Sequence, residues 1–343
     1  MKKVLFLLVA CAVMLTIFAG CGENVKTENE STETESTKNE EAVVSTDETG
    51  KENEDEKLFI GFSAGYGKVQ HWELEILGCE TAAKELGVDF IYQFADGNEQ
   101  KQVADIENFV QMGIDMLIVG PNNSEGIVPT INEVKSKGIP VMTSDIGISG
   151  TDVVAHVASD NYQIGVIAAE YMGKELNGKG KIAIVGWSAA SATQDREKGF
   201  IDTIKTNFPE IQIVANQDVG GNRTISLEKS ESIIQANPDL NGIFGSNAEN
   251  ALGAYAATQA TNRKDIIVVA VDSDNEVMKA IKDNTNLKAT VAQNPYEMGY
   301  QALTTAVKHL RGESVSDIAI DAELVTNENV DKIIERDQNF LNK

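Results

Sequence analysis

From Leu58 to the end of the chain, short apolar runs alternate with amphipathic stretches. The apolar runs are Leu58–Phe62, Phe90–Phe94, Met116–Val119, Val141–Thr143, Val153–Val157, Ile182–Val185, Ile211–Val214, Ile243–Phe244, Ile266–Val271 and Ala289–Val291. The stretches with helical spacing are Glu73–Leu86, Gln102–Met112, Ile127–Lys137, Gln163–Leu176, Lys198–Phe208, Leu227–Ala236, Ala248–Ala260 and Glu297–Leu310. This order predicts an α/β fold of parallel sheets with helices on both faces. The runs are enough for two doubly wound sheets, and a chain of 343 residues favours two lobes.

The N-terminus has the pattern of an export signal. A basic start, Met1–Lys3, precedes the apolar run Val4–Phe18, which is too short for a membrane-spanning helix. The run ends in small residues before Cys21, which resembles a bacterial lipobox. We therefore expect a lipoprotein signal peptide at 1–21, with Cys21 lipidated. The alternative is an ordinary secretory signal cut nearby.

Residues 22–57 are rich in Glu, Thr, Ser, Asn and Lys, with almost no large apolar residue. Such a segment cannot bury enough surface to offset its ordering entropy, so we expect a disordered acidic tether. Together with the lipid anchor, it predicts an extracytoplasmic protein held at the cell membrane.

Charge and cysteine content narrow the partners. The formal net charge is −24 and the sequence pI is about 4.5, which disfavours nucleic acid as a partner. Cys79 is the only cysteine beyond the N-terminal segment, so the body has no internal disulfide. The three histidines lack metal-ligand spacing, and no nucleotide-binding motif is present, so neither a metal nor a cofactor is expected.

Residues directly after the apolar runs are candidates for a binding site, because ligands of open α/β sheets bind beyond the carboxyl ends of the strands. These positions are polar and aromatic, and their main formal charges are Asp145, Asp272 and Arg196. Carboxylates accept hydrogen bonds from hydroxyls, and a guanidinium donates several in a fixed fork. The set predicts a neutral, hydroxyl-rich ligand.

Seven short motifs in order resemble the ribose-type periplasmic sugar-binding proteins, over nearly all of 58–343. They are Ile60–Ser63 with Trp72, Gly138–Val141 with Ser144-Asp145, Ala158–Asn161, Gly186 with Asp195-Arg196 and Gly199-Phe200, Phe244–Asn247 with Ala251–Ala254, Val271-Asp272, and Ala292-Gln293. The tail Leu324–Thr326 with Asn329 also looks like the family ending.

The resemblance implies a type I periplasmic binding protein: two lobes joined by a three-strand hinge that close on a small ligand. The lobes would comprise 58–159 with 294–321, and 160–293 with 322–343. The implied partners are a monosaccharide or related small molecule and the permease of an ABC importer, with no catalysis. The implied ligand-binding residues are Trp72, Asp145, Arg196, Asn247, Asp272 and Gln293, joined by His71, Tyr66 and Trp187.

Departures from the family pattern leave the ligand open. Ile146 stands where the family often has arginine, His71 replaces the first aromatic of a stacking pair, and Gly220-Gly221 replaces another aromatic. A pentose, hexose, deoxy sugar, cyclitol or furanose-like signal molecule all remain candidates. A sensor-type binding protein for chemotaxis or quorum sensing is the alternative to import.

Several of these residues also have simpler structural interpretations. Trp72 could be a core aromatic, Asp145 a turn residue, and Asn247 a helix N-cap. Arg196 could form a surface ion pair with Asp195 or Glu197, and Glu73 and Glu75 could lie on a solvated helix face.

One motif points to a different class of protein. Gly61–Gly65 matches the G-x-S-x-G elbow of hydrolases, which would make Ser63 a nucleophile with His309 as its base, in an esterase-like enzyme.

Overall fold

The computed structural model describes residues 57–67 and 69–341. The predicted signal peptide with Cys21, and the predicted tether apart from Lys57, lie outside these residues. Among the residues described, no helix is both long enough and apolar enough to cross a membrane.

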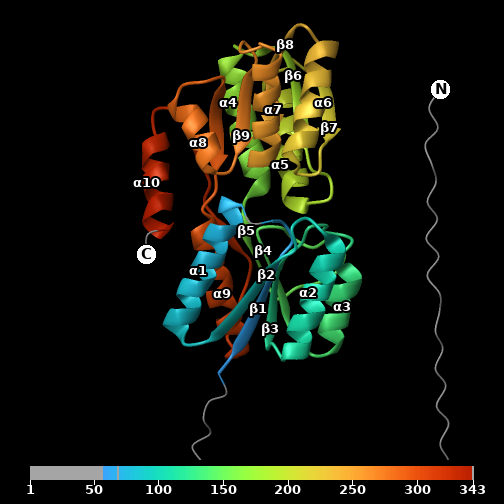
Figure 1. The fold of residues 1–343 in the computed structure, drawn as a ribbon, viewed down its shortest axis with the longest axis vertical. Coiled ribbons are helices and arrows are strands. Elements are labelled where there is room, and N and C mark those ends of the chain that lie inside the picture. Colours follow the sequence, from blue (N-terminus) through green and yellow to red (C-terminus); the bar gives the residue numbers. More distant parts are fainter. Residues whose placement is uncertain (1–56, 68, 342–343) are drawn as a thin grey trace, which may run out of the picture. The chain divides into compact units, whose positions relative to one another are not determined.

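The first lobe is built on a six-stranded sheet in the order β11-β5-β4-β3-β1-β2. Every neighbouring pair of its strands is parallel. The strands are β1 (Phe59–Ala64), β2 (Asp89–Phe94), β3 (Met116–Gly120), β4 (Val141–Ser144), β5 (His156–Ser159) and β11 (Ile318–Ile320). Its helices are α1 (Gln70–Leu86), α2 (Glu99–Met112), α3 (Val128–Ser136) and α9 (Pro295–Leu310). Helices α1 and α9 cover one face of the sheet, and α2 and α3 cover the other (Figure 1).

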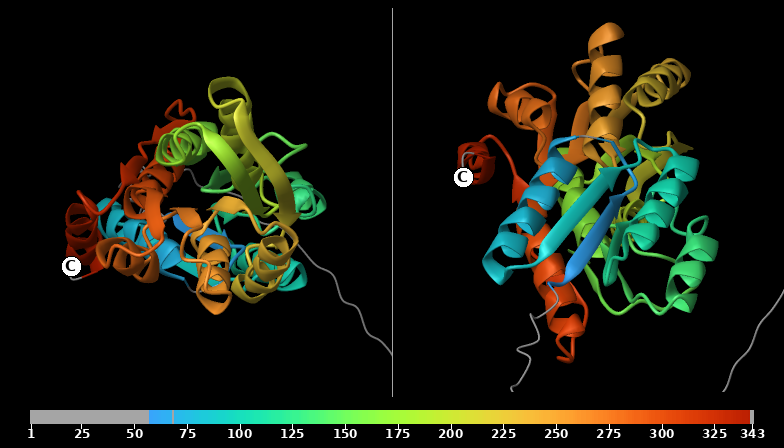
Figure 2. Two further views of the ribbon diagram at one scale, coloured as in Figure 1. Left: turned by 90° about the horizontal axis from the view of Figure 1, so that it is seen from above. Right: turned by 60° about the horizontal axis from the view of Figure 1, so that its bottom comes forward.

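The second lobe repeats this arrangement in the order β12-β10-β9-β8-β6-β7. Its strands are β6 (Lys179–Gly186), β7 (Glu210–Asp218), β8 (Leu240–Gly245), β9 (Ile267–Val271), β10 (Leu287–Ala292) and β12 (Glu323–Val325). They are parallel except for β12, which runs antiparallel to β10. Its helices are α4 (Asn161–Glu175), α5 (Ser191–Asn207), α6 (Arg223–Ala236), α7 (Ala248–Ala260), α8 (Asn275–Lys282) and α10 (Val330–Leu341). Figure 2 shows strands of both sheets with helices packed along them.

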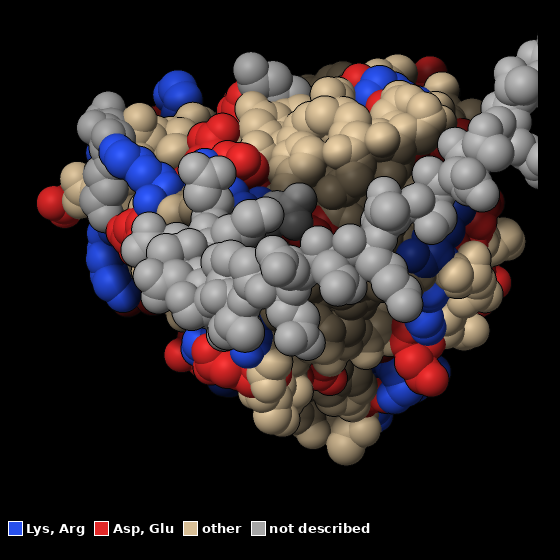
Figure 3. All heavy atoms as spheres, turned by 90° about the horizontal axis from the view of Figure 1, so that it is seen from below, with Lys and Arg blue, Asp and Glu red and all other residues tan. Residues whose placement is uncertain are grey.

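The chain passes between the two sheets after β5, after β10 and between β11 and β12. The predicted fold class, two doubly wound α/β lobes of type I, is confirmed. Both sheets direct the carboxyl ends of their parallel strands to the loops that carry the candidate residues. Charged side chains of both signs are interspersed with uncharged ones on the face in Figure 3.

The structure differs from the sequence prediction at several boundaries. Helix α5 begins at Ser191 instead of Lys198, because its first two turns carry small and polar residues that hide the helical spacing. Strand β5 lies a few residues later than the predicted Val153–Val157. The sequence prediction missed four elements: helices α8 and α10 and strands β11 and β12. The two strands are only three residues long, which is too short for a side-chain pattern.

Candidate ligand-binding site

The nine predicted site residues line a single cavity between the strand ends of the two sheets, whose empty space, counting its mouth, measures about 520 Å³. The first lobe contributes Tyr66, His71, Trp72 and Asp145, and the second contributes Trp187, Arg196, Asn247, Asp272 and Gln293. Most of these side chains are buried, and Tyr66 and Asn247 are half-buried. We expected these positions to meet, because most of them directly follow a parallel strand or lie at the start of the next helix, while Arg196 lies in the second turn of α5.

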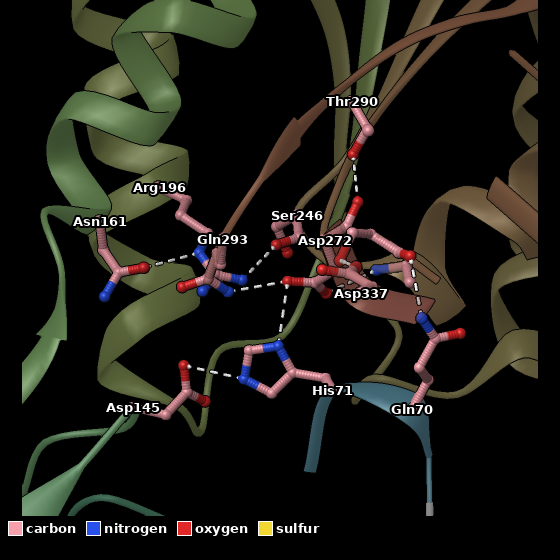
Figure 4. Close-up of polar contacts among 12 residues, drawn as sticks. Gln70, His71, Asp145, Asn161, Arg196, Ser246, Asp272, Thr290, Gln293 and Asp337 are labelled. Atoms are coloured by element: carbon pink, nitrogen blue, oxygen red, sulfur yellow. Dashed lines mark hydrogen bonds and ion pairs between the residues drawn. The ribbon is translucent and has the colours of Figure 1, made fainter. Parts of the chain in front are cut away.

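His71 lies between the carboxylates of both lobes (Figure 4). Its Nε2 is 3.4 Å from Oδ1 of Asp145, and its Nδ1 is 3.8 Å from Oδ1 of Asp272. Burial alone would lower the pKa of His71, but Asp145, Asp272 and Glu75 outweigh it and raise the pKa to about 10. His71 is therefore an imidazolium at neutral pH. Conversely, although burial opposes it, His71 and Arg196 hold the pKa of Asp145 below its usual range.

Arg196 is 3 % exposed, so the interpretation as a surface ion pair is wrong. Its Nε donates to Oδ1 of Asn161 at 2.8 Å, and its Nη1 donates to the carbonyl oxygen of Ser246 at 3.0 Å. Both partners belong to the second lobe, and Asn161 opens α4 directly after the first crossing between the sheets. These two bonds fix the guanidinium at the cavity wall (Figure 4).

The remaining polar residues of the second lobe hold Asp272 in place. Gln293 Nε2 donates to Oδ1 of Asp272 at 2.7 Å, and the backbone N–H of Ala248 donates to its Oδ2 at 3.1 Å. Asn247 is the N-cap of α7, where its Oδ1 accepts from the N–H of Asn250 at 2.8 Å. The N-cap interpretation of Asn247 is thus correct, and its position still borders the cavity.

Aromatic rings from both lobes form another part of the wall. Trp72, only 4 % exposed, packs against Phe62, with ring centroids 6.3 Å apart, and also lines the cavity. Tyr66 and Trp187 come from different lobes, and their ring centroids are 5.6 Å apart. The hydroxyl of Tyr66 donates to the carbonyl oxygen of Gly221 in the second lobe. The backbone of the Gly220-Gly221 stretch in the second lobe is thus hydrogen-bonded to a tyrosine of the first lobe.

Three buried polar atoms at this site form no hydrogen bond of good geometry among the described residues. His71 Nε2 and Asp145 Oδ1 contact each other only as an ion pair at 3.4 Å, and Gln293 Oε1 has no polar partner. Buried polar side chains in native proteins nearly always have such partners, so these atoms suit a polar ligand. A donor and two acceptors together can engage hydroxyl groups, which both donate and accept.

Other residues at the cavity were not predicted from the sequence: Val69, Ile146, Ala192, Thr193, Ala248, Glu249 and Asp274. Burial and the nearby carboxylate of Asp272 raise the pKa of Asp274 to about 7. Its place after β9, two residues beyond Asp272, was the available signal.

The prediction that Glu75 lies on a solvated helix face is wrong. Its side chain is fully buried in the first lobe, and its Oε1 accepts a hydrogen bond from the Ser144 hydroxyl. No local pattern indicates this burial, because a glutamate on an amphipathic helix most often faces water.

The hydrolase motif does not form a catalytic pair. Ser63 is completely buried in β1, and its hydroxyl has no hydrogen-bond partner among the described residues, so His309 does not contact it. His309 lies in the last turn of α9. Within the described part of the chain, no group of His, Cys, Asp and Glu could hold a metal ion.

Residues 60–314 match the family model described as "Periplasmic binding protein domain". The chain belongs to this family. The ribose import binding protein RbsB of Bacillus subtilis is 34% identical over 239 residues, which cover 69% of this chain and 77% of that protein. The D-apiose import binding protein of Actinobacillus succinogenes is 31% identical, covering 70% of this chain and 78% of its own.

A solved structure extends the likeness to the whole fold. The ABC transporter solute-binding protein of Bacillus halodurans, bound to myo-inositol, matches with a TM-score of 0.75 and 28% identity. The match covers 82% of this chain and 98% of that one. The chain is thus of the periplasmic sugar-binding type, and the resemblance read from the seven motifs is confirmed.

Proposed function

We propose that this protein captures one uncharged monosaccharide or cyclic polyol in the cavity between its lobes and delivers it to the permease of an ABC importer. The convergence of polar side chains from both lobes on one cavity carries this proposal. The ligands named for its relatives, ribose, apiose and myo-inositol, are all small polyols, in agreement with the cavity's chemistry.

The balance of charge at the cavity supports an uncharged ligand. The cations Arg196 and His71 stand against the carboxylates Asp145 and Asp272, so these four groups sum to zero at neutral pH. Of the other two acids at the cavity, Glu249 pairs with Arg223 at 2.8 Å, and Asp274, whose pKa is about 7, is partly ionised. A sugar acid would add a negative charge to a desolvated site that has no spare cation to balance it, which is costly. Hydroxyl groups can instead satisfy the buried donor and acceptors without changing the net charge.

Closure of the lobes would follow from the division of the site between them. Asp145 and Trp72 belong to the first lobe, and Arg196, Asp272 and Asn247 belong to the second. A ligand gains both sets of contacts only when the lobes are together, so binding shifts the protein toward the closed form. The proposed function includes no catalytic step, in agreement with the relatives, which are named as binding proteins.

The proposed cellular setting rests on the sequence. Residues 1–21 would direct export, Cys21 would carry the lipid, and the acidic segment 22–57 would let the binding domain reach the permease. Two or more acyl chains suffice to hold a protein at a membrane, since each buried CH₂ contributes about 0.8 kcal/mol.

Thermal-shift measurements with D-ribose, D-apiose, myo-inositol and, as a charged comparison, D-glucuronate would test the ligand class. A ligand present at one hundred times its Kd stabilises the folded state by about 2.7 kcal/mol. We expect at least one uncharged polyol to raise Tm and glucuronate to leave it unchanged. A protein stabilised by glucuronate alone would contradict the proposed ligand class.

Calorimetry on two variants would then test the site. Arg196→Ala and Asp272→Ala should each weaken binding about ten- to a hundredfold, since a hydrogen bond to a charged group contributes about 1.5–3 kcal/mol. Arg263→Ala and Asp265→Ala are matched controls, because these residues form an ion pair on the surface of the second lobe. Wild-type affinity in both site variants would exclude this cavity.

A further inference from the structure

Glu75 is a buried carboxyl just behind the ligand cavity, and no step of the proposed function uses it. It lies one helical turn after His71 on α1, and its side chain is 0% exposed. The hydroxyl of Ser144, at the end of β4, donates to its Oε1. Ser144 directly precedes Asp145, so Glu75 is connected to both members of the His71–Asp145 pair.

The surroundings of Glu75 suit a neutral acid better than an anion. Its Oε2 is buried and has no hydrogen-bond partner among the residues described. Ionising a carboxyl in such a place would leave a charged oxygen without solvent or partner, at a large cost.

An ionised Glu75 would also compete for His71. The imidazolium is within 4 Å of one carboxylate from each lobe, Asp145 and Asp272. A third carboxylate on the same helix, at the i+4 position, would attract the ring toward the interior of the first lobe. When Glu75 is neutral, the charged His71 ring forms its ion pairs with the carboxylates of Asp145 and Asp272.

We propose that Glu75 is a positioning residue that carries a proton in the binding-competent form, so that His71 pairs with Asp145 and Asp272 across the lobes. The proposal rests on the ligand site proposed above, but the proton on Glu75 is a property of the protein without ligand. Ligand affinity then depends on pH through a group that does not line the cavity.

The groups around Glu75 agree with this role. Burial, followed by the charge of Asp145, raises the pKa of Glu75, while His71 and the Ser144 hydroxyl lower it, and the net result is a pKa of about 8. On the same helix, burial keeps the Cys79 thiol protonated over this range, since its pKa lies well above the usual value. At the cavity, Asp274 has a pKa of about 7 and could obscure the titration of Glu75.

Tryptophan fluorescence of the ligand-free protein would follow this titration directly. The chain has 2 tryptophans, and both line the cavity. Trp72 lies three residues before Glu75, and its ring is 5.7 Å from that of His71. In an Asp274→Asn background, between pH 6 and pH 9, we expect one transition with a midpoint near 8. Adding Glu75→Gln should abolish this transition.

Two further variants make the test specific. Ser144→Ala removes a hydrogen bond that lowers the pKa of Glu75, so its transition should move to higher pH. Glu80→Gln, an exposed site on the same helix, should leave the transition where it is. A transition that survives Glu75→Gln, or its absence in the Asp274→Asn parent, would overturn the proposal whether or not a sugar binds.

The pH dependence of Tm gives a second readout. Glu75 has a pKa of 4.5 in the unfolded chain and about 8 in the folded protein. Its protonation therefore stabilises the folded state fully below pH 4.5, and this contribution is lost as the pH rises from 4.5 through 8. Tm of the Asp274→Asn parent should therefore fall more steeply between pH 6 and pH 8 than Tm of the Glu75→Gln variant. Parallel curves would contradict a proton on Glu75.

Any polyol found in the thermal-shift screen allows a final measurement. If only the form with a protonated Glu75 binds, the apparent Kd rises up to tenfold for each pH unit above the midpoint. This rise should be present in the Asp274→Asn parent and absent after Glu75→Gln. An equal rise in both proteins would assign the pH dependence to another group.

Discussion

Asp145 and Asp272 share an unusual backbone conformation as well as a place at the cavity. Their φ angles are 59° and 79°, in the left-handed region. Each follows a parallel strand, β4 or β9, that occupies the same position in its sheet. Each N–H donates to the next strand, to the Val157 carbonyl oxygen at 2.9 Å and the Val291 carbonyl oxygen at 3.0 Å. The two lobes thus present their carboxylates by the same strained turn, as functional sites often do.

The cost of this turn can be separated from the function of the carboxylate at Asp145. Asparagine tolerates the left-handed region, whereas alanine pays about 1–2 kcal/mol there. Asp145→Asn and Asp145→Ala remove the same charge, so both should weaken ligand binding. Urea unfolding should show Asp145→Ala to be less stable than Asp145→Asn by about 1 kcal/mol. Equal unfolding free energies would mean that the turn relaxes without cost.

At the scale of elements, pairs of glycines let helices approach each other backbone to backbone. A Cβ on Gly165 of α4 would lie 2.0 Å from the Arg196 carbonyl oxygen on α5, and one on Gly199 would lie 2.1 Å from the Tyr162 carbonyl oxygen. Gly78 and Gly299 bring α1 and α9 together in the same way. These contacts fix the helices that carry Arg196 and His71, so helix packing sets the geometry of the site.

Gly165→Ala should therefore affect both stability and binding. The added methyl group meets backbone, which cannot rotate away, and overpacking of this kind costs about 1–3 kcal/mol. Because α5 must shift, Arg196 should move from its bonds to Asn161 and Ser246, and affinity should fall. Unfolding curves and calorimetry would measure both effects. Gln163→Ala, an exposed site on the same helix, should change neither.

The sequence predicted elements well where side-chain patterns were strong. The predicted Ala248–Ala260 agrees with α7 to the residue, because Asn247 caps it and small apolar residues fill it. The first two turns of α5 and the three-residue strands β11 and β12 were missed, since their place depends on partners distant in sequence. The order of the motifs along the chain was enough to predict the nine residues that line the cavity. The neighbouring sequence, in contrast, does not distinguish the buried Glu75 from the exposed Glu80.

At the scale of the whole body, several direct hydrogen bonds join the two lobes. Tyr66 reaches Gly221, and the backbone N–H of Asn275 donates to Oε1 of Gln70 at 2.9 Å. Ser191 Oγ donates to the Gly147 carbonyl oxygen at 3.1 Å. These contacts stabilise the closed arrangement in addition to any ligand.

Removing one of these bonds should weaken ligand capture without damaging either lobe. Tyr66→Phe keeps the ring beside Trp187 but loses the bond to Gly221, worth about 0.5–1.5 kcal/mol. We expect up to about tenfold weaker binding by calorimetry and a larger radius of gyration of the ligand-free protein by small-angle scattering.

Tyr92→Phe is the matched control, because Tyr92 packs between Phe90 and Phe94 within the first lobe. If both tyrosine variants bind alike, the Tyr66 hydroxyl does not contribute to closure.

Strands β11 and β12 are the last two strands described, yet they belong to different sheets. On the ribosome, the amino-terminal lobe must therefore wait for α9 and β11, which are synthesised only after strands β6 to β10 of the second lobe. Until then, the surface of α1 that α9 covers stays open to chaperones or to premature association. The two lobes should consequently complete their folding at nearly the same time. A single cut in the chain cannot release either lobe with all of its strands, because each lobe is built from separate stretches of sequence.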